Sequence, residues 1–240
     1  MLKTFADDFS APTGLTSVIP APGAVLGRVS TPSSIQEPQA FGVRALDLCV
    51  AMAAIVLFAP LMLMITMIVR IAAPGPVLFR QARLGRNGRV FTCYKFRTMY
   101  ADADQRLEEL LATCDRSSSE WRRDQKLRDD PRIVPMGRLL RRLSLDELPQ
   151  LFNVLLGDMS VVGPRPIVPS EAWRYGRHIA SYSAVRPGIT GLWQISGRNH
   201  TTYRRRVACD VMYARSKSVG RDVEILLKTV PVLLTAHGAY

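Results

Sequence analysis

The longest apolar stretch of the chain covers residues 45–69 and lies between Arg44 and Arg70. Asp47 and Thr66 are its polar interruptions. As one straight helix it would extend about 37 Å at ~1.5 Å per residue, which exceeds the ~30 Å hydrocarbon core of a bilayer. The pattern therefore predicts a membrane-embedded helical segment.

Pro60 divides this run into pieces of about 15 and 10 residues, each too short to cross a bilayer alone. One interpretation is a single spanning helix kinked at the proline, which membrane helices tolerate. The other is a re-entrant helix–Pro60–helix segment that enters and leaves through the same membrane face. The arginines after the run place the next loop inside under both topologies, so the pattern leaves the choice open; they are Arg80, Arg83, Arg86 and Arg89.

The segments on either side of this run differ in character. Residues 1–40 are rich in turn-forming residues and show no periodic apolar face, which predicts a disordered tail. The predicted organisation is this tail, a membrane segment at 41–73 and a catalytic domain at 74–240. Within that domain, residues 77–79 and 90–94 predict a β-hairpin joined through glycines and Asn87.

Helical periodicity dominates the rest of the chain, so the predicted fold class is α+β and mainly helical, with one small hairpin. A glycine stop at Gly157 ends one of these helical regions, and a short strand is expected at 159–162. The amphipathic helices have faces that could lie in the membrane interface or line a soluble core. The helical regions are 101–128, 132–156, 202–214 and 222–236.

The net charge of +12 suits a partner that carries phosphates, such as a nucleotide, an anionic lipid or a nucleic acid. The four cysteines and three histidines show no paired or ligand-like spacing, so we expect reduced thiols, a cytosolic active domain and no zinc site. No phosphate-binding G-x-x-x-x-G-K motif is present, which argues against an ATPase.

The acidic pair Asp146 and Glu147 is the leading candidate for chemistry. Ser144, three residues before Glu147, also makes a capping box, which would explain the pair structurally. Pro149 should distort the helix start, because it removes a backbone donor. The density of nearby guanidinium groups favours phosphate binding over simple capping; these are Arg138, Arg141, Arg142 and Arg165.

Further basic residues are candidates for phosphate binding. Lys95 and Arg97 alternate along a strand and should point to one face, although a solvated face would show the same pattern. Arg165 lies between two prolines that fix its backbone. Arg186 and Arg198 flank a glycine-rich segment whose backbone could approach a ligand. Asp129 and Asp130 form a second acidic pair, which could ligate a divalent cation, although such pairs more often just precede a helix.

Several blocks of this sequence resemble, in the same order, the bacterial polyprenol-phosphate sugar-phosphate transferases. Together with the apolar run, they cover about residues 41–240, which makes the resemblance highly specific. The blocks are Tyr-Lys-Phe-Arg-Thr-Met (94–99), Asp-Pro-Arg (130–132), Leu-Ser-Leu-Asp-Glu-Leu-Pro-Gln-Leu (143–151), Gly-Asp-Met-Ser-Val-Val-Gly-Pro-Arg-Pro (157–166) and Arg-Pro-Gly-Ile-Thr-Gly-Leu-Trp-Gln-Ile-Ser-Gly-Arg (186–198).

The resemblance implies a reaction in which a UDP-sugar and undecaprenyl phosphate give the lipid diphosphate sugar and UMP. It implies Asp146 as a covalent nucleophile and Glu147 as the Mg²⁺ ligand, with galactose or glucose as the sugar. Positively charged side chains would bind the phosphates, namely Arg141, Arg165, Lys95, Arg97, Arg186 and Arg198.

The family's re-entrant helix, often with Ser before the proline, favours the re-entrant form here, although Ala59 departs from that pattern. The implied location is the bacterial inner membrane, with the active domain facing the cytoplasm. Expected partners include inner-membrane lipids, other polysaccharide-assembly enzymes and a second copy of the chain, but no nucleic acid.

Each alternative function either leaves the acidic pair without a role or requires sequence features that this chain lacks. A membrane-anchored nucleic-acid-binding protein would explain the charge, but aromatic residues are not interleaved with the arginines. A basic scaffold without catalysis is a second alternative. A CDP-alcohol-type phosphotransferase is a third, but its spaced aspartates and several membrane spans are missing.

Overall fold

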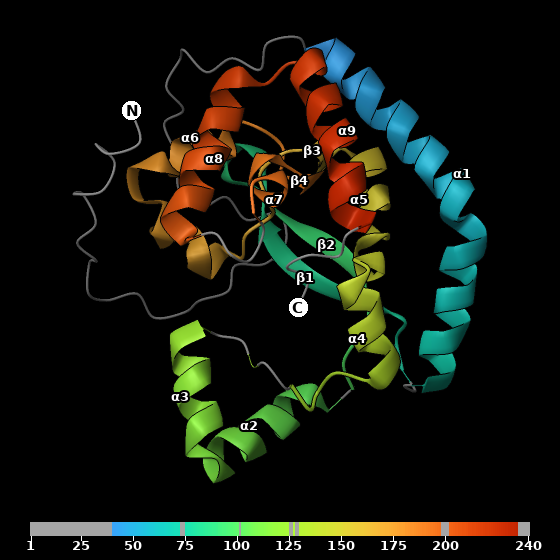
Figure 1. Ribbon diagram of the computed structural model, residues 1–240, viewed down its shortest axis with the longest axis vertical. Helices are drawn as coiled ribbons and strands as arrows, with labels where there is room; N and C mark the ends of the chain where they lie inside the picture. The colour runs from blue at the N-terminus through green and yellow to red at the C-terminus, as the bar shows by residue number, and fades with distance from the viewer. Residues whose placement is uncertain are drawn as a thin grey trace.

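A computed structural model describes residues 40–72, 75–100, 102–124, 127, 130–197 and 202–234. Residues 1–39 of the tail predicted at 1–40, together with Asp129 and Arg198, lie outside the described residues. The described part is mainly helical with two small sheets, which confirms the predicted fold class. Figure 1 shows the short strands near the centre, with helices around them.

The apolar run forms one helix, α1 (Ala40–Ala72), with Pro60 inside it. The helix continues through Pro60, because a proline removes one backbone donor and can bend a helix without ending it. The segment Phe41–Ala72 is long and apolar enough to cross a membrane, and little of it is buried. In Figure 1, α1 arcs along one side of the molecule.

Both halves of α1 pack against the same domain. Near its start, Asp47 is buried and accepts hydrogen bonds from the Ser160 hydroxyl and the Val161 amide, each at 2.8 Å. Near its end, Ile65 and Val69 belong to a hydrophobic cluster within the domain. A straight spanning helix would carry one of its ends away from the domain, so this packing favours a segment that stays along one side of it.

Large apolar side chains are also exposed on helices beside α1. These helices are α4 (Pro135–Arg142), α5 (Gln150–Leu156) and α9 (Val219–Leu234), the last with Pro231 inside. Figure 1 places α5 and α9 between the strands and α1. An apolar surface of this kind suits a membrane interface; it includes Leu139, Leu143, Phe152, Leu156, Leu227 and Val230.

The predicted hairpin is confirmed and is longer than expected. Strand β1 (Leu78–Leu84) pairs antiparallel with β2 (Val90–Phe96), and the short 3-10 turn η2 (Arg86–Gly88) joins them. Asn87 adopts a left-handed conformation in this turn, with φ of 59°. An asparagine tolerates this conformation better than most residues. The hairpin carries Lys95 into the centre of the domain.

A second sheet pairs β3 (Ser160–Val162) with β4 (Gly188–Thr190) in parallel. Gly163 and Gly188 approach so closely that a Cβ on Gly188 would overlap the amide nitrogen of Gly163. The glycine-rich segment near 188 therefore packs closely on the backbone at Gly163.

The remaining helices surround these strands. Two of them, α2 (Ala103–Thr113) and α3 (Asp115–Asp124), form an arm that extends from the body in Figure 1. The others are η4 (Pro169–His178), α6 (Ile179–Ser183), α7 (Leu192–Ile195) and α8 (Tyr203–Ser216).

A buried polar contact joins η4 to α8 in one hydrophobic cluster. The Tyr175 hydroxyl donates to Asp210 Oδ2 at 2.7 Å, and Arg206 Nε lies 4.0 Å from the same carboxylate. Burial raises the pKa of Asp210 to about 7, although Tyr175 and Arg206 both act to lower it. The folded protein therefore binds a proton at Asp210 more tightly than the unfolded chain does.

This linkage predicts a thermal stability that decreases as pH rises. The stabilisation is complete below the unfolded pKa of ~3.9 and is lost as pH rises to and through the folded value. We expect the unfolding free energy to fall by up to ~1.4 kcal/mol per pH unit in this window. Thermal unfolding of the wild type and of Asp210→Asn between about pH 5 and pH 8 tests this: the variant should have the flatter profile, and equal slopes would contradict the assignment.

Candidate active site

The acidic pair lies in an unusual turn between two helices. After α4 ends, Ser144 adopts a left-handed conformation with φ of 57°, and residues Leu145–Glu147 form a short 3-10 helix, η3. Pro149 is the N-cap of α5, so the predicted distortion of the helix start is confirmed. The capping box is not formed, because the Ser144 side chain makes no cap hydrogen bond. A left-handed serine is strained, and such strain is common at functional sites.

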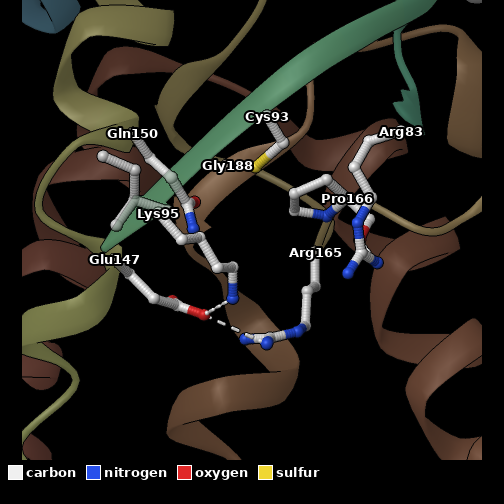
Figure 2. Close-up of a pocket in the computed structure, with 9 residues that line it drawn as sticks. Arg83, Cys93, Lys95, Glu147, Gln150, Arg165, Pro166 and Gly188 are labelled. Carbon is white, nitrogen blue, oxygen red and sulfur yellow. Dashed lines mark hydrogen bonds and ion pairs between the residues drawn. The ribbon is translucent and has the colours of Figure 1, made fainter. Parts of the chain in front are cut away.

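Glu147 lies between two cations that come from distant parts of the chain. Its Oε1 accepts a hydrogen bond from Lys95 Nζ at 2.6 Å and from Arg165 Nη2 at 3.1 Å. Figure 2 shows both contacts meeting at this one oxygen. Burial alone would raise the pKa of Glu147, but Arg165 and Lys95 outweigh it and hold the pKa at about 2. Glu147 is therefore a carboxylate at neutral pH.

Asp146 has a different environment. Its side chain is 8% exposed, and no described residue donates a hydrogen bond to it. Burial and the neighbouring Glu147 carboxylate raise its pKa, although Lys95, Arg141 and Arg165 act to lower it.

Two adjacent carboxylates with opposite pKa shifts suit different roles. Glu147 is stabilised as an anion by direct hydrogen bonds, so its charge is largely compensated. Asp146 has three cations nearby but no hydrogen bond that would reduce its nucleophilicity. The geometry therefore favours Asp146 as the reactive group and Glu147 as the group that orders the cations.

Arg141 lies near Asp146 at the end of α4. Its Nε donates to Thr98 Oγ1 at 2.8 Å, which fixes the guanidinium, and its charge acts on Asp146. Arg97 lies elsewhere: it is buried, and its guanidinium is packed beside Gly75. The guanidinium of Arg97 thus packs at Gly75, whereas the ammonium of Lys95 contacts Glu147.

The segment that carries Arg165 is held by three side chains. Arg83 Nη1 donates to the Pro166 carbonyl at 2.9 Å, and Arg206 Nη2 donates to the Arg165 carbonyl at 3.4 Å. The Tyr182 hydroxyl accepts from the Ile167 amide at 3.2 Å. Arg165 is thus pre-organised, as its flanking prolines suggested. Sequence reasoning missed Arg83 and Arg206, and no local motif would have revealed them.

Arg83, Arg165 and Pro166 line a pocket together with Lys95 and Glu147. Burial raises the pKa of the Cys93 thiol in its wall, so the reactive thiolate form is disfavoured and Cys93 is a poor nucleophile. The lining, which is drawn in Figure 2, consists of Arg83, Cys93, Lys95, Glu147, Gln150, Arg165, Pro166, Gly188 and Ile189.

Arg186 does not lie in the lining of this pocket. Its Nε donates to the Gly157 carbonyl at 2.9 Å, and it lines a second, separate pocket. Asp130 is also unavailable as a metal ligand, because Arg132 binds both of its oxygens, at 2.8 and 2.7 Å. This contact holds the pKa of Asp130 below its usual value against the effect of burial.

The carboxylate oxygens of Asp146 and Glu147 suit a hard cation such as Mg²⁺. Within the described residues, no three His, Cys, Asp or Glu side chains cluster as a metal site would require. Asp146 and the second oxygen of Glu147, which accepts from no described residue, are hard oxygen donors. Mg²⁺ commonly takes one or two carboxylates and completes its shell with phosphates and water.

Comparison with known proteins places this architecture in a family. Residues 38–236 match the family described as bacterial sugar transferase. The chain belongs to that family. The exopolysaccharide production protein ExoY of Rhizobium meliloti is 45% identical over 197 residues, which cover 82% of this chain and 87% of the relative.

Two further relatives of this sugar transferase carry more specific names. The undecaprenyl-phosphate galactose phosphotransferase of Salmonella typhimurium is 50% identical over 166 residues, covering 69% of this chain and 35% of the relative. The UDP-glucose:undecaprenyl-phosphate glucose-1-phosphate transferase of Caulobacter vibrioides is 41% identical over 205 residues, covering 82% of this chain and 71% of the relative. The predicted resemblance to polyprenol-phosphate sugar-phosphate transferases is thereby confirmed.

Proposed function

We propose that this sugar transferase moves a hexose 1-phosphate, galactose or glucose phosphate, from a UDP-sugar to undecaprenyl phosphate, and so starts the assembly of an exopolysaccharide repeat unit. The observation that carries the proposal is Asp146, a buried carboxylate with three cations nearby and no hydrogen bond from the described residues. The names of the Salmonella and Caulobacter relatives support the acceptor and the two candidate sugars.

The reaction has two displacements at one phosphorus atom. In the first, an Asp146 oxygen attacks the sugar-bearing phosphorus, the bond from that phosphorus to the bridging oxygen breaks, and UMP leaves. In the second, an oxygen of undecaprenyl phosphate attacks the same phosphorus, and the bond to Asp146 breaks. A carboxylate is a competent nucleophile of this kind, as aspartyl-phosphate enzymes show.

The protein's cations stabilise the charge that each displacement develops. Arg165 and Lys95 are fixed on Glu147, and Arg141 is fixed on Thr98. Because these groups are oriented before substrate binds, they need little reorganisation when negative charge spreads over the phosphoryl oxygens. Negatively charged phosphates beside Lys95 and Arg165 would compete with Glu147 for these donors.

A magnesium ion that is coordinated by both the protein and the substrate fits this arrangement. Asp146 and Glu147 would hold it, and Glu147 has one oxygen that no described residue occupies. When bound, Mg²⁺ supplies charge neutralisation at the diphosphate. It would also oppose the repulsion that raises the pKa of Asp146 and so favour the ionised nucleophile.

The membrane segment gives the reaction its location. Because both halves of α1 pack on the catalytic domain, we expect a re-entrant segment at the inner membrane, with the active domain on the cytoplasmic side. Exposed apolar residues on α4, α5 and α9 would then rest at the same surface. Contacts with other assembly enzymes and a homodimer stay predictions.

Cysteine labelling in intact cells tests this topology. A reporter cysteine placed in the tail, in a variant whose native cysteines are replaced, should react only after the membrane is permeabilised, because both ends of a re-entrant segment face the cytoplasm. The same cysteine placed at exposed Arg215 gives the matched control for a cytoplasmic position. Labelling of the tail from outside would instead support a spanning helix.

The nucleotide released identifies the reaction. The full chain in detergent should be incubated with Mg²⁺, undecaprenyl phosphate and UDP-galactose, UDP-glucose or their N-acetylated amino-sugar counterparts. We expect UMP, released fastest with one of the two hexose donors, because the sugar is transferred together with its phosphate. Release of UDP would mean ordinary glycosyl transfer and would overturn the proposal, and fastest turnover of an amino-sugar donor would overturn the sugar assignment.

A further inference from the structure

A second pocket lies at the turn of the β1–β2 hairpin. Arg86 and Arg89 come from the turn, and Arg186 comes from the segment before β4, so three arginines from two distant segments line the pocket. Asp158 is the one carboxylate in the lining, which leaves the pocket with a net positive charge. Such a pocket suits an anion, and guanidinium groups match phosphate oxygens through paired hydrogen bonds.

This pocket is distinct from the catalytic one. Phe91 lines the second pocket and Lys95 lines the first, and the two residues lie four positions apart on β2. The two linings share no residue, although Arg83 of the first and Phe91 of the second are cross-strand partners. The second pocket is therefore a separate neighbour of the first.

The pocket also lies beside the start of the membrane segment. Arg44, just before the apolar run, donates to the Val154 and Leu155 carbonyls at 2.8 and 3.1 Å. A Cβ on Gly157, which lines the pocket, would lie 3.8 Å from Arg44 Nη2. Leu156, the residue before Gly157, is 68% exposed and provides an apolar neighbour. Positive charge and exposed apolar surface together match a lipid with a charged headgroup.

We propose that this second pocket binds the headgroup phosphate of an anionic phospholipid. The inference rests on the membrane placement of α1, which would bring the pocket to headgroup depth. Bound lipid would hold the hairpin, and with it Lys95, in a defined position relative to the bilayer. Catalytic chemistry at Asp146 does not depend on this assignment, so the two proposals can fail separately.

A binding titration tests the proposal without relying on activity. The full chain in uncharged detergent is titrated with short-chain phosphatidylglycerol, and binding is followed by microscale thermophoresis. We expect Arg86→Gln/Arg89→Gln to bind about 30-fold more weakly, since each basic residue near an anionic surface contributes about fivefold. Arg215→Gln, which removes an exposed charge from α8, should bind within about twofold of the wild type.

Further measurements distinguish a specific lipid site from nonspecific attraction to positive charge and from binding of other anions. Arg86→Lys/Arg89→Lys keeps the charge but loses the bidentate geometry, so it should still bind at least about fivefold more weakly. Wild-type binding by this variant would overturn the site. Equal affinity for phosphatidylcholine of the same chain length would also overturn the site. Displacement of the lipid by inorganic phosphate or UMP at about 10 mM would overturn it as well.

Folding and donor-binding controls complete the experiment. Each variant should melt within a few degrees of the wild type, and if a double variant does not fold, exposed Arg89→Gln alone should weaken binding about fivefold. A raised KM for the UDP-sugar in lipid-free detergent would assign the pocket to the donor and overturn the lipid assignment.

Discussion

Replacing Asp146 with asparagine should abolish UMP release, with a loss in kcat on the order of 10⁴-fold, as is typical for removal of a covalent nucleophile. Asparagine has nearly the same shape but no charge, so it cannot form the bond to phosphorus. The same variant should fail to form a covalent sugar-phosphoryl adduct. Intact-protein mass spectrometry after incubation with UDP-sugar alone measures this adduct.

The fold should survive this change. Burial and Glu147 raise the pKa of Asp146, which means that its charge destabilises the folded state at neutral pH. Asp146→Asn should therefore melt at or above the wild-type temperature, whereas a structural carboxylate would lower it. Asp102→Asn, at a half-exposed residue on the α2 arm, removes the same charge and should leave turnover within about twofold. Residual activity above about 1% in Asp146→Asn would remove Asp146 as the nucleophile.

Replacing Glu147 with glutamine should lower kcat by about 10²- to 10³-fold, because Lys95 and Arg165 lose the anion that orients them and Mg²⁺ loses a carboxylate. The Mg²⁺ concentration that gives half-maximal activity should rise in parallel. Glu224→Gln, at an exposed ion pair on α9, provides the matched control for charge removal and should leave both quantities unchanged.

The acid limb of the pH profile of kcat/KM gives a more specific test of Glu147→Gln. The Glu147 carboxylate raises the pKa of Asp146, so its removal lowers that pKa. The loss of Glu147 also leaves the charges of Lys95 and Arg165 uncompensated, which acts in the same direction. The nucleophile would then ionise at lower pH, and the acid limb should shift to lower pH. A shift to higher pH, or an unchanged Mg²⁺ dependence, would contradict the roles assigned to the pair.

The local features of this protein could be predicted from its sequence. Four of them follow from side-chain pattern and turn chemistry within a few residues. These are the hairpin around Asn87, the glycine stop at Gly157, the short strand near Val161 and the apolar run around Pro60. The acidic pair could be predicted as a site because a proline follows it closely at a helix start and several arginines lie near it in sequence. Pattern also predicted a distorted helix start before Pro149, which the 3-10 turn confirms.

Tertiary structure alone decided which charges meet. Lys95 and Glu147 are 52 residues apart in sequence, and their contact depends on how the hairpin packs against the turn before α5. Arg97 and Arg186 have the same chemistry as Arg165, yet one packs beside Gly75 and the other lines a second pocket. The raised pKa of Asp146 likewise follows from burial, which no local pattern contains. Residue types are encoded locally, whereas distances between charges and their exposure to water result from the packing of segments that are remote in sequence.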